Sequence, residues 1–97
     1  MRVIKVKTLG LFWAKHPDAE GSLRAWFAEA EQSHWEKSQD IIDQYRYADI
    51  LPGNRAVFNI KGNRYRLVVN IHYNTGVVYI RFVGTHADYD RIDAEKI

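Results

Sequence analysis

The 97-residue chain contains no cysteine, which excludes disulfide bonds, thiolate metal ligands and thiol nucleophiles. It also lacks long apolar runs, since no stretch approaches the roughly 18 apolar residues of a membrane-spanning helix. Residues 1–17 do not contain the apolar segment of a signal peptide. We therefore expect a soluble protein that works in the cytoplasm and has no membrane partner.

The usual motifs of cofactor and metal sites are missing as well. The six glycines form neither a phosphate-binding P-loop nor a dinucleotide-binding fingerprint, so the sequence does not support an ATP or NAD site. The four histidines are not arranged as HExxH or as a close HxH pair. We expect neither a cofactor nor a metal ion.

The residues that are present suit one domain spanning residues 1–97, because 46% of them are hydrophobic and 13% aromatic. The net charge is only +2, yet residues 50–87 contain five basic side chains and no carboxylate. These five are Arg55, Lys61, Arg64, Arg66 and Arg81. At this point a small solvated basic surface explains them as well as a ligand site does.

The first half of the chain is predicted to be mainly helical. A short β-like segment, Arg2–Val6, precedes a helical face that Pro17 ends. Asp18 is a suitable N-cap for a second helix that extends to about Ser33. Ser38 is a suitable cap for a third, weaker helix, and Ala48–Asn54 is predicted to be a turn.

The second half is predicted to form β-strands, because the hydrophobic period changes there from 3.6 to 2. Three strands are expected, and Gly62-Asn63 and Asn74-Thr75-Gly76 are the expected hairpin turns between them. The strands are Arg55–Lys61, Arg64–Tyr73 and Val77–Val83. Helices followed by strands predict an α+β domain, in which the helices pack on one face of a small antiparallel β-sheet.

Alternation along the strands separates a core face from an open face. The expected core face contains Ala56, Phe58, Ile60, Tyr65, Leu67, Val69, Ile71, Tyr73, Val78, Ile80 and Phe82. The expected open face contains Arg55, Val57, Asn59, Lys61, Arg64, Arg66, Val68, Asn70, His72, Val77, Tyr79, Arg81 and Val83. Polar residues belong on any solvated face, but cations without acidic partners, interleaved with Tyr and Asn, suit a phosphodiester ligand.

The segment after the last strand contains a second group of polar residues. Gly84 allows a sharp exit from the sheet, and His86 and Tyr89, three residues apart, project together if a helical turn begins here. Histidine is a suitable proton carrier near neutral pH, although a lone histidine is more often a structural hydrogen-bonding residue.

Three blocks of sequence resemble the HigB toxin family, within the RelE-like group of bacterial toxins. They are Phe12-Trp13 with His16-Pro17, residues 57–68 (VFNIKGNRYRLV) and residues 79–90 (YIRFVGTHADYD). The resemblance spans essentially the whole chain. It implies a RelE-like fold and a toxin of a type II toxin–antitoxin pair that cleaves mRNA in the ribosome. The implied partner is a HigA-like helix-turn-helix antitoxin, through which alone the toxin would meet DNA.

The resemblance also implies functional residues. Lys61 and Arg66 match the lysine and arginine of the RelE-type site, whereas His86 and Tyr89 fall where the group has its C-terminal acid/base or base-stacking residues. The candidate catalytic residues are therefore Lys61, Arg66, His86 and Tyr89. The candidate RNA-binding residues are Arg55, Asn59, Arg64, His72 and Arg81.

The chemistry expected from these residues is metal-independent RNA cleavage, in which the ribose 2′-OH attacks the adjacent phosphorus. His86 is the preferred acid/base. Lys61 is the second candidate, because Arg64 and Arg66 close to it in the sequence favour the neutral form of its amine. Arg66 suits the phosphorane, since its fork bonds two phosphate oxygens. Two alternatives are a non-catalytic RNA- or ribosome-binding module and a protein-interaction module. The antitoxin covers either the basic face or the helices.

Overall fold

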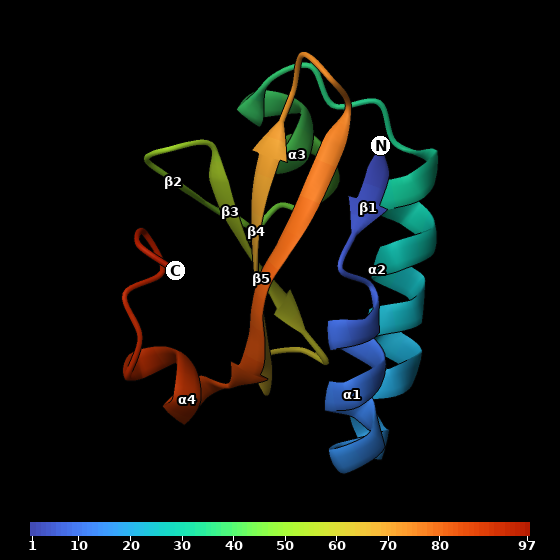
Figure 1. Ribbon diagram of the computed structural model, residues 1–97, viewed down its shortest axis with the longest axis vertical. Helices are drawn as coiled ribbons and strands as arrows, with labels where there is room; N and C mark the ends of the chain where they lie inside the picture. The colour runs from blue at the N-terminus through green and yellow to red at the C-terminus, as the bar shows by residue number, and fades with distance from the viewer.

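The chain folds into a twisted five-stranded sheet with helices against one of its faces, as Figure 1 shows. The computed structural model describes all residues, 1–97. The strands are β1 (Arg2–Ile4), β2 (Asp49–Leu51), β3 (Arg55–Ile60), β4 (Tyr65–His72) and β5 (Val77–Thr85). The helices are α1 (Lys7–Lys15), the 3₁₀ turn η1 (Pro17–Ala19), α2 (Glu20–Gln32), α3 (Ser38–Gln44) and α4 (His86–Asp90). None of the helices combines the length and the hydrophobicity that a membrane-spanning segment requires.

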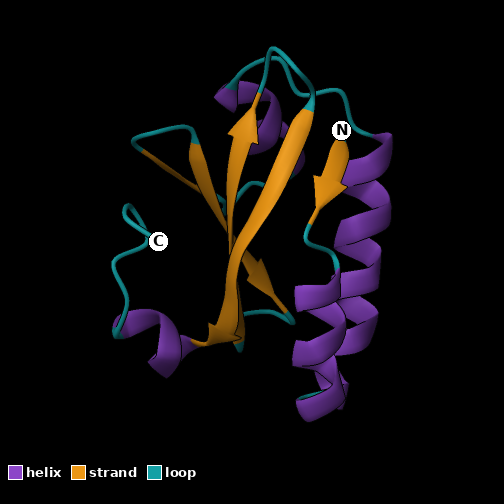
Figure 2. Ribbon diagram, in the orientation of Figure 1, coloured by secondary structure: helices purple, strands orange, loops and turns teal.

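The sheet has the strand order β1-β5-β4-β3-β2. The predicted meander of β3, β4 and β5 is antiparallel, which confirms the α+β class with helices packed on one face. The sheet is nevertheless mixed and not wholly antiparallel, because β1 pairs in parallel with β5 (Figure 2). Val3 of β1 lies beside Val78, and the crossover between β1 and the rest of the sheet is made by the helices.

Two predicted helix caps are wrong. Asp18 lies inside the turn η1, and the cap position of α2 is Ala19. The Asp18 carboxylate instead accepts hydrogen bonds from Tyr65 and Arg64. The cap of α3 is Lys37, one residue before Ser38, and the Asp40 carboxylate accepts from its backbone N–H. Asp18 thus bonds partners other than the backbone that helix-capping statistics favour, and the Ser38 side chain makes no capping bond.

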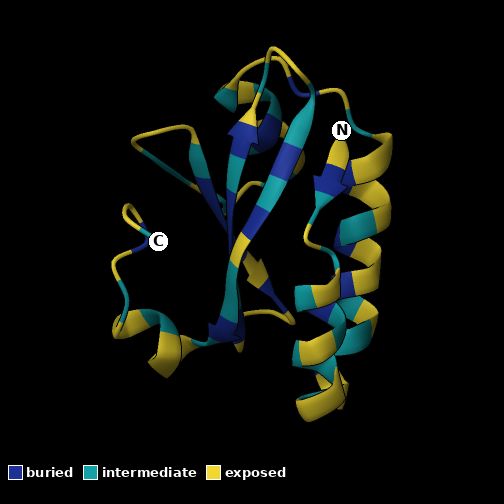
Figure 3. Ribbon diagram, viewed as in Figure 1, coloured by how far each residue is buried: buried dark blue, intermediate teal, exposed yellow.

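The core lies between the helices and the expected core face of the sheet. Leu9, Leu23, Trp26 and Ile41 from the helices are buried against Phe58 and its strand neighbours. Figure 3 shows the buried residues as dark blue segments along the strands and as patches on the helices. Trp26 and Trp35 are buried in this core, and Trp13 is partly buried against it.

The predicted turn at Ala48–Asn54 contains a short strand, β2, which pairs antiparallel with the start of β3. The β3–β4 connection also differs from its prediction. It is not a two-residue turn at Gly62-Asn63, because four residues separate Ile60 from Tyr65. The positive φ angles of this connection belong to Lys61 (55°) and Gly62 (64°).

A β-bulge changes which side chains lie on the open face. The pairing of β4 with β5 shifts between Val68 and Val69, so that Arg81 is left over between Ile80 and Phe82. Beyond this residue the alternation of β5 reverses. Phe82 therefore lies on the open face and Val83 packs on the core, the opposite of the prediction.

The open face is not uniformly cationic. Val57 and Val68 at its centre are buried under Ala94, together with Phe82 and Tyr89. The segment after α4 runs back beside β2 and β3 (Figures 1 and 2), which brings these contacts about. This segment leaves the two ends of the open face as the places where polar side chains gather.

Candidate active site on the open face

Three of the four candidate catalytic residues, Arg66, His86 and Tyr89, lie together at one end of the open face. The Arg66 Nη2 atom is 3.0 Å from His86 Nε2, and the Arg66 guanidinium lies over the Tyr89 ring, 5.0 Å from its centroid. The rings of His86 and Tyr89 are 6.5 Å apart. The structure thus places an arginine, an imidazole and a phenol within one ligand's reach.

The start of α4 positions His86 and Tyr89. The Thr85 hydroxyl accepts a hydrogen bond from the Asp88 backbone N–H (3.1 Å), and the Asp88 carboxylate accepts one from the Thr85 N–H (3.3 Å). This capping box begins the helix at His86 and places residues three apart on the same side, as the sequence predicts.

Gly84 is needed at the end of β5 for space and not for an unusual backbone angle. A Cβ atom there would lie 2.5 Å from the Phe82 ring and 3.1 Å from the Asp88 Cβ. The expectation that Gly84 provides a sharp exit therefore needs correction. Its absent side chain lets Phe82 and α4 approach each other across the open face.

The contact with Arg66 favours one tautomer of a neutral His86 ring. A guanidinium has donors and no acceptor, so the imidazole Nε2 must accept, and a neutral His86 carries its proton on Nδ1. His86 Nδ1 lies 3.8 Å from a carboxylate oxygen of Asp90, one turn along α4. The arrangement provides an imidazole with a free base at Nε2 once Arg66 turns toward another acceptor.

A second carboxylate, Asp49 of β2, lies on the other side of Arg66. Its oxygen is 3.5 Å from Arg66 Nη1. The Arg66 side chain is only 16% exposed and its Nε atom has no hydrogen-bond partner, whereas the Asp49 side chain is 62% exposed. Sequence reasoning missed Asp49, because the predicted turn gave it no partner, and it missed Asp90, whose spacing of four from His86 was the available signal.

Lys61 and Arg64 lie in the β3–β4 connection, outside this cluster. The Arg64 guanidinium pairs with Asp18 at 2.7 Å on the helix side of the sheet, so it does not lie on the open face where the alternation placed it. The hydrogen bond from Tyr65 and the positive charges of Arg64 and Lys61 hold the pKa of Asp18 below its usual range. Lys61 itself is exposed and contacts neither Arg66 nor His86.

The other candidate RNA-binding residues are spread along the sheet. Asn59 is exposed and lies directly opposite Arg66 on the neighbouring strand. His72 packs edge-on against Tyr79 at 5.1 Å, and Arg81 lies over the same ring at 5.6 Å, so these three form a second aromatic–cationic group. Arg55 is half-buried, and its Nη1 atom is buried without a partner.

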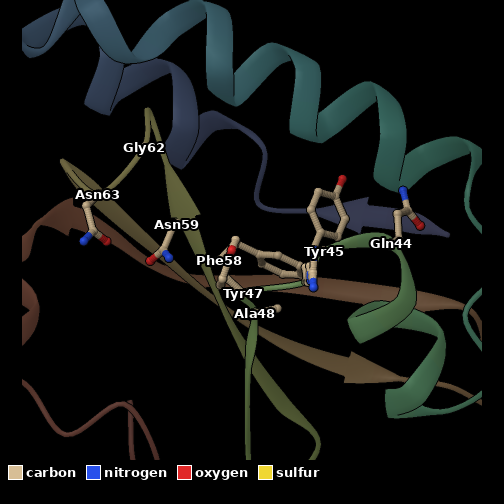
Figure 4. A pocket seen from close by; sticks show the side chains of 9 residues that line it. Gln44, Tyr45, Tyr47, Ala48, Phe58, Asn59, Gly62 and Asn63 are labelled. Carbon is tan, nitrogen blue, oxygen red and sulfur yellow. The ribbon is translucent and has the colours of Figure 1, made fainter.

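A cavity of about 660 Å³ opens next to Asn59 (Figure 4). It lies between the connection from α3 to β2 and the end of β3, and its lining includes Tyr45, Tyr47 and Phe58. Sequence reasoning did not find it, because its walls come from segments that the chain brings together only on folding. No three His, Asp or Glu side chains are grouped so that they could hold a metal ion.

The comparison with known families identifies the class of protein. The profile of the HigB toxins, described as the RelE-like toxic component of a toxin–antitoxin system, matches residues 19–92. The chain is therefore a RelE-like toxin of a toxin–antitoxin system. It belongs to the HigB toxin family, which confirms the resemblance of the sequence blocks.

Curated proteins similar to this chain include the mRNA interferase toxin HigB of Escherichia coli strain K12. The mRNA interferases HigB of Escherichia coli O157:H7 and Shigella flexneri are similar to the same degree. In each case 28% of 96 aligned residues are identical, and the alignment covers 93% of this chain and 88% of the relative.

Proposed function

We propose that this protein is an mRNA interferase, an endoribonuclease that inhibits translation and growth by cleaving mRNA. The observation that carries the proposal is the contact of Arg66 with both His86 and Tyr89 on the open face. The names of the curated relatives support the choice of mRNA as the substrate. A phosphate-binding arginine beside an imidazole suits RNA cleavage without a metal, because the pair supplies charge stabilisation and a proton carrier.

In the proposed reaction the 2′-oxygen of a ribose forms a bond to the adjacent phosphorus, and the bond from phosphorus to the 5′-oxygen breaks. The proton of the 2′-OH goes to a base, and the leaving 5′-oxygen receives a proton from an acid. The products are a 2′,3′-cyclic phosphate, which water can open, and a 5′-hydroxyl end. The protein must therefore supply a base, an acid and a stabiliser for the extra negative charge on the phosphorane.

Arg66 supplies the charge stabilisation. A phosphate that takes the place of the Asp49 carboxylate accepts two parallel hydrogen bonds from the guanidinium. These bonds are stronger in a half-buried site than in water. The same movement frees the Nε2 atom of His86 to accept the 2′-OH proton, while Asp90 stays at the opposite ring nitrogen. Tyr89 orients the nucleotide by stacking or by hydrogen bonding.

Lys61 is the second candidate for acid or base. It extends from the turn next to β3, two residues beyond Asn59, so an RNA strand that crosses from Arg66 along β3 would pass it. Arg55, Arg81 and His72 provide further positions for the backbone and bases of that strand. Arg64 contributes through its charge, because its guanidinium is already paired with Asp18.

The proposal includes the partners that go with this class of toxin. A HigA-like helix-turn-helix antitoxin neutralises the protein and alone connects it with DNA. The ribosome supplies the mRNA in a strained conformation, which compensates for the small number of general bases in the cluster. All of this takes place in the cytoplasm.

The test is induced expression in bacteria followed by mapping of mRNA 5′-ends on translated and untranslated messages. Wild type is expected to produce new cuts confined to translated messages. Arg66→Lys keeps the charge but loses the fork, and His86→Gln keeps the size of the side chain but loses the base, so both are expected to lose the cuts.

Asn74→Ala is the matched control, since Asn74 is an exposed residue of the β4–β5 turn at the far end of the sheet. It should cut like wild type. Growth arrest that persists in folded His86→Gln without new 5′-ends would contradict the nuclease and favour a non-catalytic RNA- or ribosome-binding module.

A further inference from the structure

We propose that the cavity beside Asn59 binds one nucleobase of the RNA substrate, next to the nucleotide whose phosphate Arg66 holds. This inference rests on the proposed ribonuclease function and extends it to how the substrate is held. The cavity, of about 660 Å³, is of the size in which small ligands are bound in proteins. Figure 4 shows the side chains that line it, which come from the end of β3, the β3–β4 connection and the segment after α3.

The cavity exists because β2 is shorter than β3. β2 pairs only with residues Arg55–Val57, whereas β3 continues to Ile60. From Phe58 onward, that edge of β3 has no neighbouring strand, and residues 44–48 diverge from it before β2 begins. An unpaired strand edge presents backbone donors and acceptors, and in this place they face a cavity.

The lining combines flat apolar walls with amides. Phe58 is buried, and Tyr45 packs edge-on against it at 5.0 Å. The Tyr45 hydroxyl donates to a carboxylate oxygen of Glu29 at 2.5 Å, so this wall is held in place. Trp26, Trp35 and Tyr45 cover the Phe58 ring, so Phe58 forms the floor of the cavity, and stacking on a base falls to the aromatic ring at its surface.

Tyr47 is the free aromatic side chain of the cavity. It is 77% exposed, and Leu11 is the only other large hydrophobic side chain of the chain exposed to a comparable extent. Its ring belongs to the lining and makes no hydrogen bond within the protein. A base that enters the cavity would cover this ring, which explains why the sequence keeps an aromatic residue in solvent.

Amides supply the polar part of the lining. Asn59 and Asn63 are both exposed, and neither side chain is engaged in a hydrogen bond within the protein. An amide carries a donor and an acceptor side by side, which is the pattern that pairs with the edge of a base. The cavity therefore offers stacking surfaces and edge-reading groups together.

The position relative to Arg66 connects the cavity with the cleavage site. Asn59 is the cross-strand partner of Arg66, and directly opposed residues of antiparallel strands are about 5 Å apart. Asp49, two residues after Tyr47, contacts the Arg66 guanidinium at 3.5 Å. A base in the cavity and a phosphate on Arg66 thus belong to the same or adjoining nucleotides.

The first experiment is an NMR titration of the purified full-length chain with each of the four nucleoside 5′-monophosphates. At least one is expected to shift the side-chain amide signals of Asn59 and Asn63 and the ring signals of Tyr47, saturably. Tyr47→Ala and Asn59→Ala should each weaken this binding about fivefold or more, as the loss of one stacked or paired base predicts. The Asn74→Ala control should bind like wild type.

The second experiment maps the bases that flank the cuts made by wild type, Tyr47→Ala and Asn59→Ala. The variants should redistribute the cuts and relax the base preference at one position beside the cleaved bond. Three results would overturn the cavity as a base site: no nucleotide shifts these signals, the variants bind as wild type does, or the flanking bases are unchanged.

The two proposals fail separately. Cuts that depend on His86 but keep their flanking bases in the cavity variants leave the nuclease intact and overturn the cavity. Nucleotide binding in the cavity by a wild-type protein that makes no cuts supports the cavity and overturns the nuclease. Signals that shift with a protein partner and with no nucleotide overturn the cavity proposal in favour of a protein-binding surface.

Discussion

Arg66 is the residue at which three separate parts of the chain meet. It extends from β4 and contacts Asp49 from β2 and both His86 and Tyr89 from α4. Asp49 and His86 occupy the two guanidinium nitrogens of Arg66 that the proposed phosphate would contact. Alternation along β4 predicted that Arg66 lies on the open side of the sheet. It could not predict the partners of Arg66, because Asp49 and His86 are 17 and 20 residues away in the chain and only the fold brings them close.

At the same scale, Asp18 and Tyr65 join the helices to the sheet through a hydrogen bond of 2.5 Å. This bond, together with the charge of Arg64, lowers the pKa of Asp18, and it raises the pKa of Tyr65. Because the pKa of Asp18 is lower in the folded protein, its ionised carboxylate stabilises the fold at pH values above the usual pKa of an aspartate. This contribution disappears as the pH falls through the lowered pKa. Because the pKa of Tyr65 is higher in the folded protein, its neutral phenol stabilises the fold at pH values below the usual pKa of a tyrosine. This contribution disappears as the pH rises through the raised pKa.

We therefore predict that Asp18→Asn lowers the free energy of unfolding most at neutral pH. The difference from wild type should shrink toward acid, where Asp18 becomes protonated, and toward strong alkali, where Tyr65 ionises. Urea unfolding at a series of pH values measures it, with Asp43→Asn as a control on an exposed helix position. A difference that is the same at every pH would contradict the role of the ionised carboxylate.

Among the elements, α4 is the one whose formation decides the site. It has five residues, too few to be stable alone, and its first turn is held by the Thr85–Asp88 capping box. The sequence predicted the turn from the spacing of His86 and Tyr89. It did not show that Gly84 makes room for Phe82 beside this helix, because that need arises from the bulge in β5.

Thr85→Ala is expected to cost about 1 kcal/mol of stability and to lower the cleavage rate, because both His86 and Tyr89 depend on the first turn of α4. Ser38→Ala is the matched change, since Ser38 is a typical capping residue that makes no capping bond in α3. It should alter stability by no more than a few tenths of a kcal/mol. Thermal unfolding and 5′-end mapping measure the two effects, and equal effects of both substitutions would argue against the capping box.

For the molecule as a whole, the segment after α4 decides how much of the open face is free. It covers Val57 and Val68 with Ala94, and Ile97 packs against the same cluster. In Figure 3 this segment is otherwise mainly exposed. The cover divides the face into the Arg66 end and the His72–Tyr79–Arg81 end. Under the proposed function, a substrate strand would cross the sheet around this segment and not over an empty face.

Removal of residues 93–97 is predicted to destabilise the protein by about 2 kcal/mol, because it exposes two buried valines. Ala94→Asp in the full-length chain should act in the same direction by placing a charge against them. Lys96→Ala, at an exposed position of the same segment, should leave the unfolding midpoint in urea unchanged. A truncated chain with the midpoint of wild type would show that the segment does not contribute to the fold.

The sequence by itself determined the class of the fold, the positions of the main helices and strands, the division into a core and an open face, and the family. These follow from periodicity and from short motifs, which act over a few residues at a time. For the same reason, His86 and Tyr89 could be predicted to project together.

The tertiary structure alone decided the parallel pairing of β1 and the exchange of Phe82 and Val83 between the two faces. It also decided the ion pair of Arg64 with Asp18 and the partners of Arg66. It also decided the cavity beside Asn59, which forms where a short strand leaves a longer one unpaired. Most of these features join residues that are distant in the chain. The exchange of Phe82 and Val83 depends on one extra residue, Arg81, in β5. Such contacts are selected by the packing of the whole molecule, and no local pattern of residues specifies them.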